Sequence, residues 1–447
     1  MIAATRRRRL HCWLPPALVL LATGCGPPRR SPSASPAATG GANVVLVLID
    51  TLRADHLPFY GYLRDTAPFL AGVAARGAVF ENAFSSSTWT APATASLFTG
   101  LYPPQHGVVT GLIATRRLQK RDPTVKINRL PESLETLGEV MKRAGYRTFG
   151  VSNNANVRGE LGFAQGFDRF RYFHSAQATA PELTAVVKEW QPELARGGKY
   201  FLYLHYMDPH APYDERAPWY VPGRTRKERR LAAYDSEIRY VDEHLRELYQ
   251  LLRWEQDTLL VVLADHGEEF REHGRDWHGN TLYGEVLRIP LVFHFPARIR
   301  PQRVSDNVSI VDVLPTLCDF LRLPPDPSRA GLSLLGRLQG EALPERALYA
   351  HLYRQAGLWQ APELRLQALI LGNWKYLAGT PGEELYDMGA DPEEAVNRLA
   401  DARPVADALR LRLAELERGM AGFKPESVSI PLDHETQEKL RALGYVN

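Results

Sequence analysis

Short apolar runs alternate with amphipathic segments along the chain from residue 43 onward. The runs are rich in valine, leucine, isoleucine and aromatic residues, and few polar residues interrupt them. Nearly continuous apolar runs of this kind are typical of strands that are buried on both faces of a sheet. Four strands are therefore predicted, in chain order: residues 43–50 (NVVLVLID), the end of residues 133–153, residues 199–208 (KYFLYLHYMD) and residues 257–265 (DTLLVVLAD).

Helical spacing marks several of the segments between these strands. Residues 66–77 predict a helix closed by a glycine, and residues 133–153 predict a helix before the turn at Gly145. In residues 229–254 apolar side chains recur at helical spacing: Ile238, Val241, Leu245, Leu248 and Leu252. Alternating strands and helices predict an α/β fold with a doubly wound, mostly parallel sheet and helices on both faces.

The pattern changes near residue 345. From there the sequence indicates short strands joined by turns, followed by helices to the end of the chain. We therefore predict a main α/β domain over residues 43–344 and a smaller C-terminal α+β subdomain over residues 345–447.

The first 42 residues are predicted to lie outside the fold. Four arginines precede an apolar stretch of about a dozen residues, too short for a stable bilayer span and typical of a secretory signal. This stretch ends in LLATGC, which resembles a bacterial lipoprotein signal with Cys25 as the lipidated residue, although Ala22 stands where leucine is usual. We predict a signal peptide over residues 1–25 and a disordered Pro/Ser/Gly tether over residues 26–42.

The predicted location is therefore the periplasmic face of a bacterial membrane, with the lipid on Cys25 as anchor. The alternative is a plain cleaved signal and a soluble periplasmic or secreted protein. Only three cysteines occur, so Cys318 is left without a disulfide partner if Cys12 is cleaved off and Cys25 is acylated. The net charge of +3 is too small to indicate nucleic-acid binding.

Carboxylates and imidazoles follow the predicted strands. Asp50 ends the first strand, and Asp208 and His210 follow the third. The fourth strand is followed by Asp265, His266, His273 and His278. Ligands of open parallel sheets collect at the carboxyl ends of the strands, so these side chains are expected to converge on one edge. Such a set suits a divalent cation, with Ca²⁺, Mn²⁺ and Zn²⁺ as candidates. Each Asp and His also has an ordinary alternative as a helix cap or a loop residue.

Several motifs in the right order resemble the sulfatase family of the alkaline phosphatase superfamily. They are NVVLVLIDTLRADHLPFYGY, TWTAPATASLFTGLYPPQHGV, VLADHGEEFREHG and ELYDMGADPEEAVN, together with residues 66–85 and HGNTLYGEVLRIPLVFHFP. The resemblance covers the chain from about residue 43 to its end. It implies an active-site metal at the strand ends and hydrolysis of anionic sulfate, phosphate or phosphonate esters.

The resemblance also implies roles for individual residues. Asp50, Asp265 and His266 match metal ligands. Thr90, two residues before Pro92, matches the nucleophile and completes the ligand set. His210 and His278 match positions that contact the ester oxygens or protonate the leaving group.

Four positions depart from the family pattern. Thr94 replaces the arginine that steadies the nucleophile, and Thr51 replaces a second metal-binding aspartate. Asn153 and Ala155 stand at the positions of a Lys-x-His pair. Threonine cannot be converted to formylglycine, because its β-carbon carries a methyl group.

The threonine bears on the substrate class. A free hydroxyl needs activation by a metal. A phosphothreonine can then be hydrolysed by a second in-line attack of water on phosphorus. A sulfated threonine, by contrast, lacks the route by which the aldehyde hydrate of formylglycine eliminates sulfate. We therefore expect phosphate or phosphonate ester hydrolysis. Two alternatives remain: sulfate ester hydrolysis by the unmodified hydroxyl, and a catalytically inactive, metal-binding scaffold lipoprotein.

Overall fold

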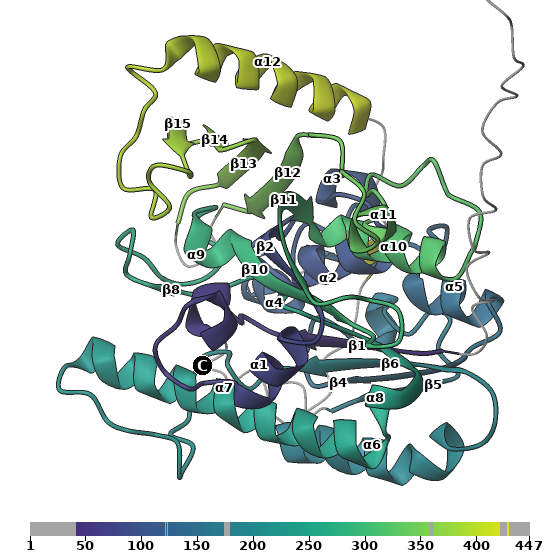
Figure 1. The fold of residues 1–447 in the computed structure, drawn as a ribbon. Coiled ribbons are helices and arrows are strands. Elements are labelled where there is room, and N and C mark those ends of the chain that lie inside the picture. Colours follow the sequence, from purple (N-terminus) through teal and green to yellow (C-terminus); the bar gives the residue numbers. More distant parts are fainter. Residues whose placement is uncertain are drawn as a thin grey trace, which may run out of the picture. The chain divides into compact units, whose positions relative to one another are not determined.

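An eight-stranded sheet forms the centre of the molecule (Figure 1). The computed structural model describes residues 42–120, 122, 124–173, 179–356, 361–420 and 427–428. In order across the sheet, its strands are β11 (Gln302–Ser309), β2 (Ala78–Phe84), β10 (Arg288–His294), β7 (Thr258–Leu263), β1 (Asn43–Ile49), β6 (Tyr200–Tyr206), β4 (Arg147–Ser152) and β5 (Arg169–Tyr172).

Strand directions confirm the predicted fold class. Within the described residues of the main sheet, β10 runs antiparallel to its neighbours β2 and β7, and the other strand pairs of this sheet are parallel. The central strand β1 is buried along its whole length, as its unbroken apolar sequence predicts.

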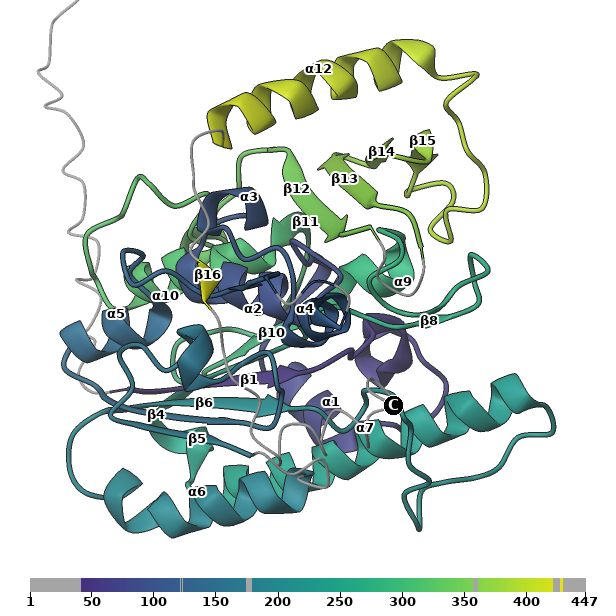
Figure 2. The ribbon, with the colours of Figure 1, turned by 180° about the vertical axis from the view of Figure 1, so that it is seen from behind.

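Helices cover both faces of this sheet (Figures 1 and 2). One face carries α1 (Pro68–Ala74), α6 (Ala180–Leu194) and α7 (Arg226–Leu251), and the other carries α2 (Thr90–Thr99), α5 (Leu137–Arg143) and α10 (Val313–Phe320). The long helix α7 begins where Thr225 and Glu228 form a capping box. Its buried side includes Ile238, Val241, Leu245 and Leu248, four of the five residues that the helical spacing identified.

The C-terminal part of the described chain forms a second, antiparallel sheet. Its strands are β12 (Leu348–Arg354), β13 (Leu364–Leu371), β14 (Trp374–Gly379) and β15 (Gly382–Asp387), and α12 (Arg403–Met420) lies against β13 and β14 (Figure 1). Apolar side chains join it to the main sheet in one cluster with Phe84, Leu282 and Leu287. The smaller C-terminal subdomain of the predicted fold class is thus confirmed.

Short elements complete the described fold. They are α3 (Pro103–His106), α4 (Leu112–Gln119), β3 (Ile127–Asn128), α8 (Trp254–Asp257), β8 (Glu269–Phe270), β9 (Asp276–Trp277), α9 (Gly284–Leu287), α11 (Leu335–Leu338), β16 (Ser427–Val428) and the 3₁₀ turns η1 (Ala54–His56), η2 (Pro58–Tyr60), η3 (Gly159–Leu161) and η4 (Ile310–Asp312). Among the described helices, none combines the length and the apolar character that a bilayer span requires. The predicted signal peptide and, apart from Ala42, the predicted tether lie outside the described residues.

Candidate active site

Three neighbouring parallel strands bring polar side chains to one edge of the main sheet. The strands β7, β1 and β6 lie side by side with their carboxyl ends together. Asp50 follows β1, Asp265 follows β7, and His210 follows β6 by a short loop. The convergence that the sequence predicted therefore results from strand order.

Two carboxylate oxygens at this edge are buried and unpaired. Asp50 Oδ1 and Asp265 Oδ2 have no hydrogen-bond partner among the described residues. His266 Nε2 lies 3.4 Å from Asp265 Oδ2 and 3.9 Å from Asp50 Oδ1. Unpaired buried charges are costly, so two such oxygens beside an imidazole nitrogen fit a divalent cation. The donor set of oxygens and one imidazole suits the ions named above.

The second oxygen of Asp50, Oδ2, is held by hydrogen bonds from neighbouring side chains. Asn154 Nδ2 donates to Asp50 Oδ2 at 2.5 Å, and His205 Nε2 lies 3.3 Å from the same oxygen. His205 Nδ1 is in turn 2.9 Å from the Tyr203 hydroxyl. With that hydroxyl as donor, His205 carries its proton on Nε2 and donates it to Asp50. Oδ2 is thereby occupied and Oδ1 stays available.

His205 is also a possible ligand by distance alone. His205, Asp50 and Asp265 each offer one ligand atom, and these atoms lie within 4.8 Å of one another. The hydrogen bonds favour His205 as a residue that orients Asp50, because the unpaired oxygens face His266 instead.

Asp265 is fixed through its other oxygen. Asp265 Oδ1 accepts the backbone N–H groups of His266 at 2.9 Å and of Thr51 at 3.2 Å. Thr51 has a φ of 57°, a left-handed conformation that is unusual for a β-branched residue. Its carbonyl accepts the Tyr234 hydroxyl at 2.7 Å, which helps to hold the strained turn.

Thr90 opens helix α2 directly beside these carboxylates. Its Oγ1 lies 3.3 Å from His266 Nε2 and donates toward Asp50 Oδ2 at 3.5 Å. Every residue of α2 is buried, and alanines at positions 91, 93 and 95 keep the surroundings of the hydroxyl small. The helix N-terminus favours negative charge on this oxygen.

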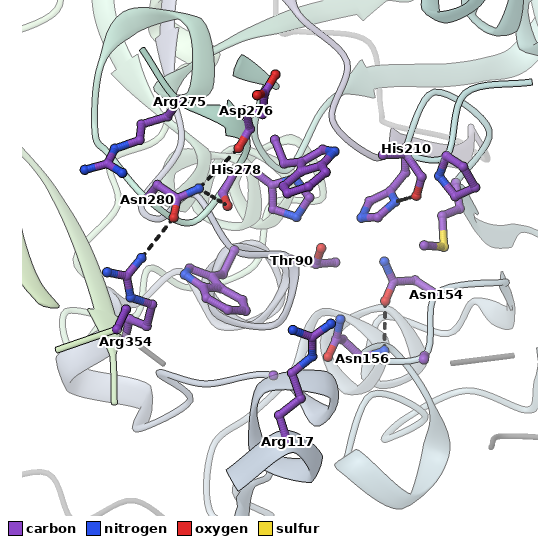
Figure 3. Close-up of a pocket in the computed structure, with 18 of the residues that line it drawn as sticks. Thr90, Arg117, Asn154, Asn156, His210, Arg275, Asp276, His278, Asn280 and Arg354 are labelled. Carbon is purple, nitrogen blue, oxygen red and sulfur yellow. Dashed lines mark hydrogen bonds between the residues drawn. The ribbon is translucent and has the colours of Figure 1, made fainter. Parts of the chain in front are cut away.

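Three histidines lie around the hydroxyl, and Figure 3 shows two of them, His210 and His278, near Thr90. The ring of His278 lies 4.5 Å from that of His266 and 5.0 Å from that of His210, measured between centroids. His278 Nδ1 is 3.0 Å from Glu268 Oε1, and His266 Nδ1 is 3.0 Å from the Gly267 carbonyl. The structure thus brings all six predicted site residues into one cluster.

The electrostatics of the cluster match these contacts. Burial and the charge of Asp50 raise the pKa of Asp265. Burial lowers the pKa of His266 and His210, and it lowers that of His278 to about 4. Burial also raises the pKa of Glu268 to about 7. Neutral imidazoles beside crowded carboxylates leave negative charge for a cation to neutralise.

The departures from the family pattern are also visible. Thr94 is fully buried, and its Oγ1 has no hydrogen-bond partner within the described part of the chain. Asn153 is buried, and Ala155 lines the cavity described next. No cationic side chain stands at these three positions.

A cavity of about 750 Å³ opens above Thr90. Asn154, His210 and His278 line it close to the hydroxyl, as Figure 3 shows. Its walls also carry two tryptophans and four arginines: Trp89, Trp277, Arg117, Arg271, Arg275 and Arg354. This lining can receive an ester with a sizeable group beyond the reacting centre.

Sequence reasoning missed two residues that hold the site, Asn154 and His205. His205 sits inside a strand that is apolar and aromatic, and Asn154 lies in a polar loop after β4. Neither position carries a recognisable local pattern, since their contact with Asp50 arises from the pairing of β1 with β6 and of β6 with β4.

Fold and site together define a hydrolase of sulfuric or phosphoric esters whose central sheet and helices form an α/β fold. The profile of the sulfatase family matches residues 42–323, and the chain belongs to this family, whose members depend on a metal ion.

The Δ4,5-hexuronate-2-O-sulfatase of Bacteroides thetaiotaomicron is 22% identical over 90% of this chain and 94% of its own length. Among solved structures, a 2-O GAG sulfatase superposes with a TM-score of 0.69 at 19% identity, covering 87% of this chain and 95% of the other. The phosphonate monoester hydrolase of Agrobacterium radiobacter superposes with a TM-score of 0.68 at 19% identity, covering 87% of this chain and all of the other.

Proposed function

We propose that this protein hydrolyses phosphate or phosphonate esters with Thr90 as the nucleophile. The position of Thr90 Oγ1 supports this proposal most directly: it lies 3.3 Å from His266 Nε2, the nitrogen that also lies next to the two unpaired carboxylate oxygens. Asp50, Asp265, His266 and Thr90 would hold one divalent cation, for which Ca²⁺, Mn²⁺ and Zn²⁺ are the candidates. When bound, such an ion lowers the pKa of a neighbouring hydroxyl and neutralises negative charge on the ester oxygens.

The chain's own groups prepare Thr90 for attack. Thr90 Oγ1 lies 3.5 Å from Asp50 Oδ2 and 3.3 Å from His266 Nε2, and it gives up its proton to water as it forms its bond to phosphorus. His266 directs Nδ1 to the Gly267 carbonyl, so the lone pair on Nε2 stays free to act as a ligand. The N-terminus of α2 stabilises the anionic oxygen.

His278 and Glu268 supply the proton for the leaving group. With Glu268 in its acid form, the carboxyl donates to His278 Nδ1, and Nε2 of the neutral ring carries a proton. As the bond from phosphorus to the leaving oxygen breaks, that oxygen takes the Nε2 proton and Glu268 transfers its own to Nδ1. His210, 5.0 Å from His278 between ring centroids, is placed to bind an ester oxygen.

A water molecule completes the reaction by attacking phosphorus in line. The bond from phosphorus to Thr90 Oγ1 breaks, and Oγ1 takes a proton from water. One proton of the attacking water passes to His278 Nε2, and His278 Nδ1 returns its proton to Glu268. This second attack releases phosphate from a threonine ester, whereas a sulfated threonine has no elimination route to sulfate. The side chain therefore favours phosphorus esters over sulfate esters.

Turnover of four model esters tests the proposal. The purified protein is assayed with p-nitrophenyl phosphate, bis-p-nitrophenyl phosphate, p-nitrophenyl phenylphosphonate and p-nitrophenyl sulfate, each with Ca²⁺, Mn²⁺ and Zn²⁺. We expect turnover of at least one phosphorus ester, a loss of about 10³-fold or more in Thr90→Val, and measurable activity in Thr90→Ser. Full activity in Thr90→Val would rule out the nucleophile.

Sulfate ester hydrolysis by the unmodified hydroxyl is the second candidate. It is favoured by the relatives, since the first sequence relative and one of the two structures above carry sulfatase names. Turnover of p-nitrophenyl sulfate without any phosphorus ester would establish it. A third outcome is that the protein binds metal but turns over none of the four esters, which would favour the scaffold alternative.

We also propose that the protein is exported and anchored by a lipid on Cys25, which lies outside the described residues. The apolar stretch before Cys25 supports this location. We expect wild-type protein in the membrane fraction of a bacterial host and Cys25→Ala in the soluble periplasmic fraction. A Cys25→Ala variant that still sediments with membranes would refute a lipid anchor at this residue.

A further inference from the structure

Two arginines at the edge of the cavity form a cationic pair that no carboxylate among the described residues neutralises. Arg354 is the last residue of β12, and Arg275 lies in the loop between β8 and β9. Both line the cavity, and Figure 3 shows them together on one side of Asn280. Burial and the charge of Arg275 lower the pKa of Arg354, as expected for two cations close together.

The hydrogen bonds of Arg354 are incomplete. One nitrogen of its guanidinium donates to Asn280 Oδ1 at 2.9 Å, a neutral amide oxygen. Its Nε is buried and has no hydrogen-bond partner among the residues that the structure describes. The Arg275 side chain forms no ion pair with any described residue. A buried donor without a partner and a cation without a counter-charge favour an anionic partner from outside the described residues.

The one acidic residue of the cavity wall is already paired. Asp276 Oδ1 lies 2.6 Å from Arg230, and Asp276 Oδ2 lies 3.3 Å from Arg271. Its charge therefore does not cancel that of the pair formed by Arg275 and Arg354. The cavity wall is left with a net positive charge at this edge.

Asn280 connects this pair to the reacting centre. Its Nδ2 donates to the carbonyls of His278 and Asp276, at 3.2 Å and 3.3 Å, which turns Oδ1 toward Arg354. Arg354 is thus held by a residue two positions after His278, while Figure 3 shows the Arg275 and Arg354 side chains away from Thr90. An ester held at Thr90 can extend to this pair.

We propose that Arg275 and Arg354 form an anion subsite that binds a second anionic group of the substrate, remote from the ester that reacts at Thr90. The proposal rests on the proposed function for the location of the reacting ester. It assigns the substrate to a class with at least two anionic groups, such as a bisphosphorylated or disulfated sugar. Planar guanidinium groups bind phosphate, sulfate and carboxylate alike through paired N–H groups.

Binding to a Thr90→Val variant tests the subsite apart from catalysis. Calorimetry with Mn²⁺ present compares glucose 6-phosphate with glucose 1,6-bisphosphate, and glucosamine 6-sulfate with its 2-N,6-O-disulfate. We expect at least one doubly charged sugar to bind about tenfold tighter than its singly charged partner, which is the effect of one well-placed charge-assisted contact. If the phosphorylated sugars show the preference, the remote group is a phosphate; if the sulfated sugars show it, the remote group is a sulfate.

Arginine variants locate the effect. In the Thr90→Val background, Arg275→Gln with Arg354→Gln should abolish the preference and leave the singly charged sugars within about twofold of their affinity. Arg354→Lys should retain part of it. Arg271→Gln is the matched control, because Arg271 lies in the same loop but is already paired with Asp276, and it should keep the preference.

The outcomes separate the subsite from the proposed function. A missing preference in Thr90→Val, or a preference that persists in the double arginine variant, would overturn the subsite. An arginine-dependent preference in a protein whose wild type turns over no ester would support the subsite and refute the proposed activity.

Discussion

The two oxygens of Asp50 have different tasks in this site. Oδ2 takes the hydrogen bonds of Asn154 and His205, and Oδ1 is left unpaired beside His266. Burial alone would raise the pKa of Asp50, but the hydrogen bond from His205 and the nearby imidazoles outweigh it and hold the pKa below its usual range. The carboxylate is therefore kept ionised, with Oδ1 oriented toward His266, and a metal ligand must be both deprotonated and oriented in this way.

Removing Asn154 should weaken this arrangement. In Asn154→Ala we expect metal affinity to fall by about 10–100-fold, because loss of a residue that orients a ligand typically has this cost. Calorimetric titration with Mn²⁺ measures the affinity. Excess metal should restore much of the turnover, whereas it should restore none in Thr90→Val. Unchanged affinity in Asn154→Ala would show that Asp50 does not depend on this donor.

At the residue scale, sequence reasoning found the groups that face a ligand and missed those that hold them. Asp50, Asp265 and His266 follow apolar strands directly, so strand order predicts their convergence. Asn154 and His205 act through pairing between strands distant in the sequence. Arg354 was missed for the same reason, because nothing in the sequence of β12 shows that its end reaches the cavity.

At the scale of elements, His273 joins the loop after β8 to the C-terminal region. Its Nδ1 lies 2.7 Å from Glu285 Oε1 and its Nε2 lies 3.2 Å from the Glu394 carbonyl, while its ring stacks on Tyr283 at 3.8 Å. Burial alone would lower the pKa of His273, but the hydrogen bond and charge of Glu285, with a smaller effect of Glu394, outweigh it and raise the pKa.

This contact should stabilise the protein mainly at acidic pH. A raised pKa in the folded state gives stability that is fully present below the unfolded value of about 6.5 and is lost as pH rises through the higher folded value. Urea unfolding of wild type and His273→Gln should therefore differ more at pH near 5.5 than near 8.5, by up to about 1 kcal/mol because the ring is partly exposed. Equal differences at both pH values would contradict a protonated His273.

The sequence predicted the parallel strands and the long helix α7 but not the edge of the sheet. The strand β10 is mostly apolar, like the parallel strands of the main sheet, and composition does not encode strand direction. The strand β11 carries mostly polar residues, because it pairs only with β2 at the edge of the main sheet and is half exposed. The direction of β10 and the presence of β11 therefore depend on the strands with which they pair, which the local sequence does not show.

For the whole molecule, we expect the unpaired carboxylates to make stability depend on a bound metal ion. Asp50 and Asp265 are both fully buried, and their unpaired oxygens lie next to His266. Without a cation their mutual repulsion remains in the folded state, while in the unfolded chain both groups are separated and hydrated. An ion that binds the folded state alone adds stability by mass action, about 4 kcal/mol at a free concentration a thousand times its dissociation constant.

We therefore expect chelation by EDTA to lower the melting temperature, and Mn²⁺, Zn²⁺ or Ca²⁺ to restore it in order of affinity. Asp265→Asn should respond little to either treatment, because it removes a ligand and the repulsion together. Thr90→Val should keep most of the response, since the carboxylates and His266 remain. Differential scanning calorimetry of the three proteins measures this. Equal melting temperatures of wild type with EDTA and with each metal would show that the buried carboxylates bind no cation, and the proposed activation of Thr90 would lose its basis.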